Sequence, residues 1–222
     1  MLLAIDTSTT WCGLALSRAG EVIAECTWQA RTHHTSHLAP ALLELLKRSG
    51  TSLGELQGVA VALGPGSFTA LRVGLALAKG ICLVHHLPII GIPTLNILAA
   101  AQPCLPDFDS LIVAIQAGRG RFAIGRYIRA QDTWEATAEP QVTTLQELLG
   151  TLAEPTYLCG EFTSQERQQI ARHSHIYLPA PSACVRRPAV LAELGWARLQ
   201  KGEVNSLAAL TPIYLHIHEG IA

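Results

Sequence analysis

The segment DTST at residues 6–9 combines a carboxylate with three consecutive hydroxyl side chains, directly after an apolar run. An aspartate at the end of a strand can hold a metal-bound water, and the hydroxyl and backbone N–H groups beside it can bind a phosphate. The same residue types also stabilise a tight turn through local hydrogen bonds. Residue types alone favour the turn, and they leave a degenerate phosphate loop formed by Asp6, Thr7 and Ser8 as the alternative.

A second candidate phosphate site is the glycine-rich stretch Gly64–Gly80, GPGSFTALRVGLALAKG. A P-loop needs a lysine beside its second glycine and a hydroxyl after it, whereas Lys79 lies several helical turns further on. The Gly-Pro-Gly segment instead predicts a sharp turn from a strand into a helix, with Ser67 as the N-cap. The N-terminus of that helix could still attract an anion, but the stretch does not have the pattern of a nucleotide-binding loop.

Metal-binding and nucleophilic chemistry have little support in the sequence. His33 and His37 are four residues apart, but no HExxH pattern and no acidic neighbour accompanies them. The six cysteines are scattered without CxxC spacing, which indicates buried free thiols in a reducing compartment. No GxSxG motif occurs, and no serine or cysteine has a recognisable partner. We therefore predict no catalytic residue and no metal ligand.

Composition limits the class of protein further. Hydrophobic residues make up 49% of the 222 residues and charged residues 15%, which allows a sizeable core and argues against disorder. The formal net charge is −1 and no basic run exceeds Arg186-Arg187, so RNA contact is expected only through a partner. The N-terminus lacks the pattern of a signal peptide, and we read no apolar run as long enough to span a bilayer. We expect a soluble cytoplasmic protein.

The order of elements repeats along the chain. The first series is a buried strand, a hairpin, an amphipathic helix, a second strand, an apolar helix, and a short strand with a further helix: 2–6, 12–29, 36–49, 58–64, 68–85 and 88–101. After a Pro- and Asp-rich link at 102–110, a strand and hairpin return, followed by helices and strands up to residue 201. Two such series indicate an α/β architecture with mixed sheets. We predict one domain over 1–102 and another over 103–222.

Two apolar helices of the first half have faces that could meet a partner. The helix over 36–49 carries leucines on one face, and the helix over 68–85 is apolar nearly all round. The second helix also has small residues at i, i+4 and i+8, which would let another helix approach closely. The alternative is that both helices are core helices on the sheet. The residues predicted at a partner interface are Leu38, Leu42, Leu45, Ala70, Leu71, Gly74, Leu75 and Ala78.

Several stretches together resemble the TsaB (YeaZ) family, which takes part in threonylcarbamoyladenosine modification of tRNA. The stretches are LLAIDTST, RTHHTSHLAPALLELL, VALGPGSFTALRVGLALAKGI and PIIGIPTLNILA. They cover roughly the first hundred residues, and the string GPGSFTALRVGL is specific. The second half is similar only in the order of elements and in TPIYLH at 211–216, which looks like the family's terminal P-x-Y-L-R.

The resemblance implies a fold of the actin/sugar-kinase/Hsp70 (ASKHA) type with two ribonuclease-H-like halves. It also implies a non-catalytic subunit that activates TsaD, the paralogue that transfers the threonylcarbamoyl group to adenosine 37 of tRNAs reading ANN codons. The ATPase TsaE joins that pair, and the first-half helices form the TsaD contact or, without TsaD, a similar homodimer. No cofactor is expected on the chain alone, and an ATP or ADP site at the joint surface with TsaD stays open. No membrane contact is implied.

The sequence departs from the family pattern in three places. Gln116 replaces the aspartate that commonly ends the second half's first strand, the usual H-S-E-x-L appears at 34–38 without its acid, and His216 replaces the terminal arginine. An amide cannot act as a carboxylate for a metal or a water. The departures favour the non-catalytic reading over two alternatives, which are an independent ASKHA-type ATPase or kinase that uses Asp6 and a protein of the M22-like peptidase (glycoprotease) class.

Overall fold

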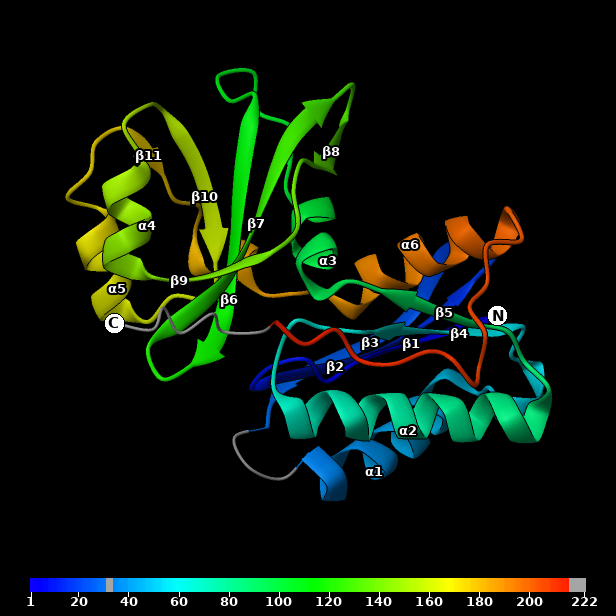
Figure 1. Ribbon diagram of the computed structural model, residues 1–222. Coiled ribbons are helices and arrows are strands. Elements are labelled where there is room, and N and C mark those ends of the chain that lie inside the picture. Colours follow the sequence, from blue (N-terminus) through cyan, green and yellow to red (C-terminus); the bar gives the residue numbers. More distant parts are fainter. Residues whose placement is uncertain (31–33, 216–222) are drawn as a thin grey trace. The chain divides into compact units, whose positions relative to one another are not determined.

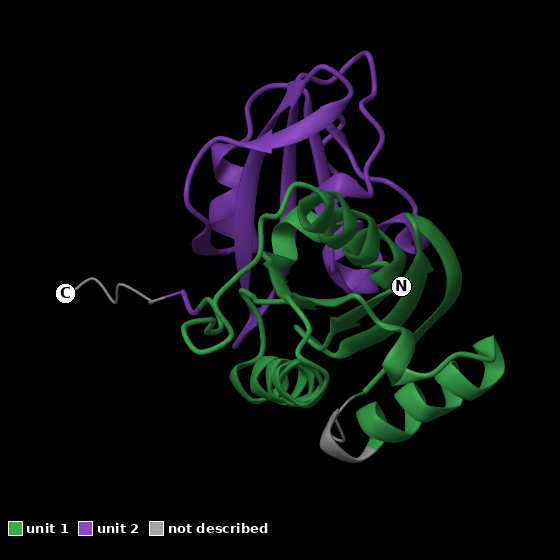
Figure 2. Ribbon diagram, turned by 90° about the vertical axis from the view of Figure 1, so that its right-hand side faces the viewer, with its two compact units in different colours: residues 1–97, 186–213 green, residues 98–185, 214–222 purple. Residues whose placement is uncertain are grey.

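The computed structural model of the chain describes residues 1–30 and 34–215, and their side chains except those of 34–36. The chain forms two compact units (Figure 2). Unit 1 contains residues 1–97 and 186–213, and unit 2 contains residues 98–185 together with the segment from 214 onward. The first crossing lies near the predicted boundary at 102. The prediction of an uninterrupted second domain over 103–222 differs from the structure, because residues 186–213 return to unit 1.

Unit 1 is built on a five-stranded mixed sheet of order β3-β2-β1-β4-β5. The first three strands are antiparallel neighbours, and β4 and β5 extend the sheet with parallel pairing to β1 and β4. The central strands β1 and β4 are buried over their whole length, as apolar strands covered on both faces should be. The strands are β1 (Leu2–Asp6), β2 (Trp11–Arg18), β3 (Glu21–Gln29), β4 (Gly58–Ala62) and β5 (Ile89–Ile92).

Helices cover both faces of this sheet (Figure 1). On one face, α1 (His34–Ser49), the short η1 (Leu53–Glu55) and α2 (Phe68–His85) accompany a core that includes Leu3 and Ile5. On the other face, α6 (Pro188–Gln200) packs on a core that includes Leu2 and Ala4. Successive side chains of β1 therefore belong to cores on opposite faces of the sheet, because side chains alternate along a strand with a period of two residues.

Helix α2 is the one described helix whose length and mean hydropathy would allow it to cross a membrane, contrary to our expectation that no run is long enough. Its buried residues run from Ala70 to Cys82 and belong to the core of unit 1. Of this 18-residue stretch 39% is buried, so packing on the sheet accounts for one side of the helix and leaves apolar residues on the other. The helix α3 (Thr94–Ala100) then carries the chain from unit 1 into unit 2.

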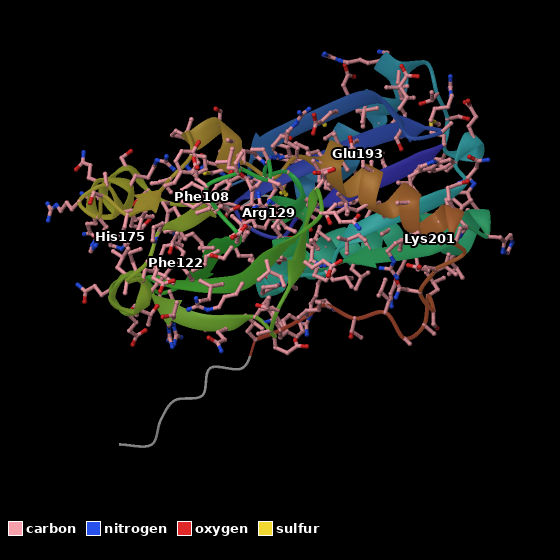
Figure 3. All side chains as sticks on the ribbon, turned by 90° about the horizontal axis from the view of Figure 1, so that it is seen from above. Phe108, Phe122, Arg129, His175, Glu193 and Lys201 are labelled. Carbon is pink, nitrogen blue, oxygen red and sulfur yellow. The ribbon has the colours of Figure 1, made fainter. Side chains whose placement is uncertain are left out.

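Unit 2 is built on a second mixed sheet of order β11-β10-β6-β7-β8, with β9 also paired to β7. Its core lies between the sheet and two short helices, α4 and α5, and includes Phe122, which lies inside the unit (Figure 3). The elements are β6 (Ser110–Gly118), β7 (Arg121–Ala130), β8 (Thr133–Ala136), β9 (Gln141–Thr144), α4 (Leu145–Thr151), β10 (Thr156–Gly160), α5 (Ser164–Ile170), β11 (Ile176–Tyr177) and η2 (Pro181–Cys184).

The two units begin in the same way, which confirms the predicted repeat of strand and hairpin. Each starts with a strand that pairs antiparallel to the first strand of a hairpin: β1 pairs with β2 of the β2–β3 hairpin, and β6 pairs with β7 of the β7–β8 hairpin. In the β2–β3 turn Ala19 and Gly20 have φ of 50° and 90°, and in the β6–β7 turn Arg119 and Gly120 have φ of 52° and 70°. Positive φ at both turn residues is typical of tight hairpins, because such turns follow the right-handed twist of the strands.

Candidate functional site

The loop after β1 holds the predicted phosphate-binding residues, and it is buried. Asp6 is 3% exposed, Thr7 1% and Ser8 0%. Asp6 Oδ1 accepts a hydrogen bond from the backbone N–H of Ser8 at 2.8 Å, and Asp6 Oδ2 lies 2.8 Å from Nε of Arg186. Both carboxylate oxygens are therefore engaged inside unit 1.

Arg186 completes this cluster from a position 180 residues further along the chain. Its side chain is 1% exposed, and its Nη2 donates to Thr9 Oγ1 at 3.1 Å and to the carbonyl of Trp11 at 3.3 Å. Removing two charges from water is costly, and additional hydrogen bonds of this kind are what make a buried pair tolerable. Sequence reasoning missed this role, because Arg186 stood out there only as half of a basic pair.

The hydroxyl groups of the loop are bonded to three other segments of the chain. Thr7 Oγ1 donates to the carbonyl of Ala70 in α2 at 2.6 Å. Ser8 Oγ lies 2.7 Å from Oγ1 of Thr94 in α3, and that oxygen also accepts from the N–H of Gly64 at 2.9 Å. The hydroxyls of Thr7 and Ser8 therefore link the loop after β1 to α2 and α3.

The Gly-Pro-Gly turn is shaped by contact with the same loop. A Cβ on Gly66 would lie 2.1 Å from the carbonyl oxygen of Ser8, and the N–H of Ser67 donates to that oxygen at 2.7 Å. Gly64 has φ of 106°, a conformation that favours glycine. Ser67 caps α2 by accepting from the N–H of Ala70. The predicted sharp turn and the predicted N-cap are both confirmed.

The row of small residues in α2 faces inward, which corrects the prediction that it admits a second helix. A Cβ on Gly74 would lie 2.3 Å from Thr7 Oγ1, so glycine is what lets α2 approach the loop after β1. The other predicted interface residues are also buried, at 6% exposure or less, and a side chain with so little surface cannot offer a partner contact in this conformation. They are Leu38, Leu42, Leu45, Ala70, Leu71, Leu75 and Ala78.

The exposed side of α2 is a different set of residues. Phe68 is 52% exposed, Leu83 66% and Val84 72%. The guanidinium carbon of Arg72 lies 3.5 Å from the centroid of the Phe68 ring. Between the ends of the helix this side carries Ala76 and Gly80 together with the charged Arg72 and Lys79, and α1 beside it exposes Leu43. We call Phe68, Leu83 and Val84 the outer face of α2.

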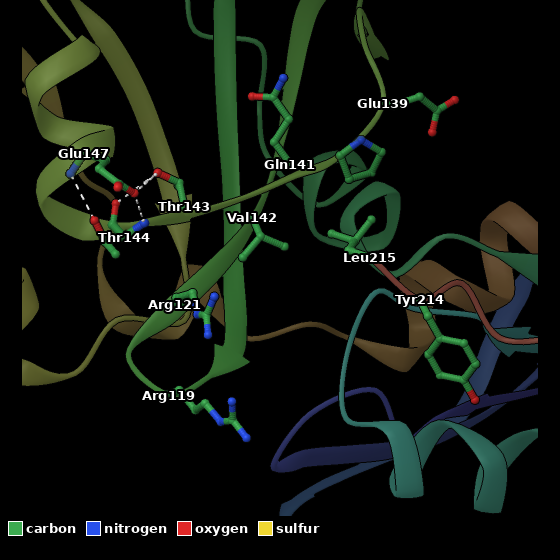
Figure 4. Close-up of a pocket in the computed structure, with 11 residues that line it drawn as sticks. Arg119, Arg121, Glu139, Gln141, Val142, Thr143, Thr144, Glu147, Tyr214 and Leu215 are labelled. Carbon is green, nitrogen blue, oxygen red and sulfur yellow. Dashed lines mark hydrogen bonds between the residues drawn. The ribbon is translucent and has the colours of Figure 1, made fainter. Parts of the chain in front are cut away.

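Unit 2 contains a cavity of about 820 Å³ that sequence reasoning did not predict (Figure 4). Arg119 and Arg121 of the β6–β7 hairpin line it, together with Tyr214 and residues 139–144. Glu147 at its edge accepts from the N–H of Thr144 at 2.8 Å and caps α4, and this backbone hydrogen bond lowers the pKa of the Glu147 carboxyl. Glu139 and Glu147 line the same cavity, so two carboxylates balance its two guanidinium groups.

Gln116, which replaces an expected aspartate, serves a structural purpose in β6. Its Nε2 donates to the carbonyl of Glu161 at 3.2 Å and to the carboxylate of Glu166 at 3.5 Å. An aspartate could not donate these bonds, so the amide fits its surroundings. Within residues 1–30 and 34–215 no group of three His, Cys, Asp or Glu side chains could hold a metal ion. His33 lies outside the described residues.

Two units that each begin with a β-hairpin on a mixed sheet define an α/β protein of the ASKHA class. The structure is similar to that of YeaZ from Pseudomonas aeruginosa, with a TM-score of 0.75 and 22% identity over 96% of this chain and 99% of that chain. A more distant likeness is component A of (R)-2-hydroxyglutaryl-CoA dehydratase from Acidaminococcus fermentans, with a TM-score of 0.57 and 10% identity over 90% of this chain and 98% of that chain.

Sequence comparison identifies the family. The model of the TsaD family, tRNA N6-adenosine threonylcarbamoyltransferase, matches residues 26–208. The tRNA threonylcarbamoyladenosine biosynthesis protein TsaB of Bacillus subtilis is 32% identical over 100% of this chain and 96% of its own length. TsaB of Escherichia coli is 34% identical over 67% of this chain and 68% of its own length. The chain belongs to the TsaB family.

Proposed function

We propose that this protein is a non-catalytic subunit that works with TsaD and the ATPase TsaE to make threonylcarbamoyladenosine at position 37 of tRNA. The observation that carries the proposal is the buried ion pair between Asp6 and Arg186. An independent ASKHA-type ATPase or kinase would use the Asp6 carboxylate, and here Arg186 already binds that carboxylate. Membership of the TsaB family supports the role in tRNA modification.

The chemistry of the described residues supports the non-catalytic part of the proposal. Phosphoryl transfer depends on metal ions and on groups that stabilise developing charge. Here the Asp6 carboxylate is bonded to an arginine, the hydroxyls of Thr7 and Ser8 are bonded internally, and Gln116 is an amide. The described residues also provide no metal cluster for an M22-like peptidase. An independent ATPase, kinase or peptidase is therefore disfavoured.

The partner surface is proposed to be the outer face of α2. Phe68, Leu83 and Val84 expose apolar area on one helix, and aromatic and aliphatic anchors of this kind are what protein interfaces bury. A tRNA N6-adenosine threonylcarbamoyltransferase of Trichlorobacter lovleyi is 30% identical over 134 residues that cover 51% of this chain and 39% of that protein. Because TsaD carries a related unit, TsaD and a second copy of this chain offer similar helices, and a homodimer forms when TsaD is absent.

We further propose that the chain alone binds no nucleotide and that any ATP or ADP lies at the joint surface with TsaD. The candidate residues for a site within this chain, Asp6, Thr7 and Ser8, are buried and hydrogen-bonded. The formal net charge of −1 favours tRNA contact through the complex in the cytoplasm over binding by this chain alone.

Reconstitution tests the proposal. The purified chain is expected neither to hydrolyse ATP nor to modify tRNA, and to restore modification when it is added to TsaD and TsaE of the same organism together with threonylcarbamoyl-AMP. Size-exclusion chromatography is expected to show a dimer alone and a heterodimer with TsaD. Full tRNA modification by TsaD and TsaE without this chain, or steady ATP turnover by this chain alone, would contradict the subunit role.

A further inference from the structure

Two cysteines of unit 2 lie almost in contact, although they are 25 residues apart in the sequence. Cys159 is the last residue but one of β10, and Cys184 ends η2. Their sulfur atoms are 3.6 Å apart, and both side chains are buried, at 0% and 4% exposure. Nothing in the established family role uses this pair.

The surroundings of the two sulfur atoms differ. Cys184 Sγ accepts from the Cys159 thiol, and Nη1 of Arg167 lies 3.8 Å from it. Arg167 is held in place because its Nη2 also donates to the carbonyl of Pro179. The hydrogen bond from Cys159 is the main reason why the pKa of Cys184 is lowered, and Arg167 lowers it further. The same hydrogen bond, together with burial, raises the pKa of Cys159.

We propose that Cys159 and Cys184 are an oxidation site that forms an intramolecular disulfide when the protein meets a hydroperoxide. A disulfide needs the sulfur atoms at about 2.05 Å, so the 3.6 Å separation has to close by small side-chain rotations. Cys184 acts as the nucleophile, because a thiolate and not a thiol attacks peroxide, and a neighbouring cation favours the thiolate. Cys159 supplies the second thiol.

The chemistry balances in two steps. The Cys184 thiolate attacks one oxygen of hydrogen peroxide, the O–O bond breaks, and the products are a sulfenic acid on Cys184 and hydroxide. The Cys159 sulfur then attacks the sulfenic sulfur, an S–S bond forms, and the sulfenic oxygen leaves with two protons as water. Overall two thiols lose two electrons and two protons, and one peroxide becomes two waters.

Access to the pair is through η2. The three residues before Cys184, 181–183, are exposed, and a single 3-10 turn is a segment that opens locally at low cost. The disulfide would fasten η2 to β10. The chain crosses from unit 2 to unit 1 after Val185, and Arg186 is the residue that pairs with Asp6. Oxidation would therefore attach Cys184, two residues before Arg186 in the chain, to β10.

Peptide mapping of the oxidised full-length protein tests the proposal. The native chain is treated with hydrogen peroxide, its remaining thiols are alkylated, and it is digested with trypsin. Residues 130–167 and 173–186 form tryptic peptides that contain only Cys159 and only Cys184. The expected product is these two peptides joined, two hydrogen atoms lighter than their sum, and separated again by dithiothreitol. Full alkylation of Cys184 after peroxide treatment would overturn the proposal.

Variants separate this pair from the other thiols. Cys104→Ser is the matched control, because Cys104 is a half-buried free cysteine of unit 2 outside the pair, and it should leave the linked peptide unchanged. Cys159→Ser should abolish the link and leave the Cys184 sulfenic acid open to dimedone. Arg167→Ala should slow disulfide formation at least a few-fold, and Arg167→Lys should slow it less. A link that joins Cys104 to either peptide would also overturn the assignment.

Discussion

The ion pair between Asp6 and Arg186 decides how the loop after β1 is interpreted. The sequence favours a tight turn there and leaves a phosphate loop as the alternative, and the structure places Nε of the buried Arg186 2.8 Å from Oδ2 of Asp6. The sequence carries no local signal for this partner, since the two residues are 180 positions apart and nothing in their neighbourhoods indicates pairing. Local composition predicted the turn correctly, and only the tertiary fold could reveal what neutralises Asp6.

Removing the arginine tests the importance of this pair. Arg186→Ala leaves the Asp6 carboxylate buried without its partner, and the free energy of unfolding is expected to fall by about 3–5 kcal/mol. Arg187→Ala is the matched control, because Arg187 is 62% exposed in its pair with Glu25 and exposed pairs contribute less than about 1 kcal/mol. Urea unfolding followed by circular dichroism measures both. Equal losses for the two variants would show that the buried pair has no special role.

The glycines of α2 give a second comparison within one helix. Gly74→Ala places a methyl group 2.3 Å from Thr7 Oγ1, so the helix or the loop must shift, at a cost of about 1–3 kcal/mol. Gly80→Ala meets nothing within 4 Å and should stabilise the helix by about 0.5–1 kcal/mol. Thermal unfolding should therefore move in opposite directions for the two variants. A stabilised Gly74→Ala protein would contradict the close approach of α2 to the loop.

Helix α2 shows how much of an element the sequence can predict. Its bounds of Phe68–His85 match the predicted helix over 68–85, because Ser67 and the Gly-Pro-Gly turn mark its beginning locally. Which side of the helix faces the core was left open by the sequence, and the residues proposed there for a partner interface are the buried ones. A helix that is apolar nearly all round has no clear polar face, so the choice depends on which side the sheet covers. The short strand β9 was missed for a related reason, since QVTT has little apolar content and its pairing with β7 is tertiary.

Charge substitutions on opposite sides of α2 test this orientation. Leu75→Arg puts a charge at a position with 6% exposure and should unfold unit 1. Leu83→Arg, at 66% exposure, should leave the melting temperature nearly unchanged and weaken association with TsaD or with a second copy. Val204→Arg, at an exposed apolar position outside α2, is the control that should affect neither. Circular dichroism and size-exclusion chromatography provide the readouts, and normal association of Leu83→Arg would place the interface elsewhere.

The whole chain has a discontinuous organisation that no local pattern indicates. The Pro- and Asp-rich link at 102–110 lies a few residues after the first crossing between units, which falls inside α3 between Ile97 and Leu98. The second crossing, between Val185 and Arg186, lies in a stretch with Pro179, Pro181 and Pro188, but we predicted no boundary there. Helix α6 therefore reads as the end of a second domain, although its buried face packs on the sheet of unit 1. The order of elements along the chain is a weak guide to domain boundaries when a later segment, here residues 186–213, returns to the first unit.

This organisation predicts that the first half of the chain cannot fold alone. A fragment of residues 1–102 lacks both Arg186 and α6, so it leaves Asp6 unpaired and exposes the apolar face that includes Leu2 and Ala4. Unpaired buried charge and uncovered apolar area both oppose folding. The fragment is expected to show no cooperative thermal transition and poor dispersion of its amide NMR signals.

Supplying the missing segment should rescue folding. Residues 1–97 joined through a flexible linker to residues 186–213 contain every described part of unit 1, and this protein is expected to unfold cooperatively. The same fusion carrying Arg186→Ala should be less stable, and one that ends before α6 should behave like the 1–102 fragment. If residues 1–102 alone unfolded as cooperatively as the fusion, the returning segment would be an accessory, and neither the Asp6–Arg186 pair nor α6 would be needed to hold unit 1 together.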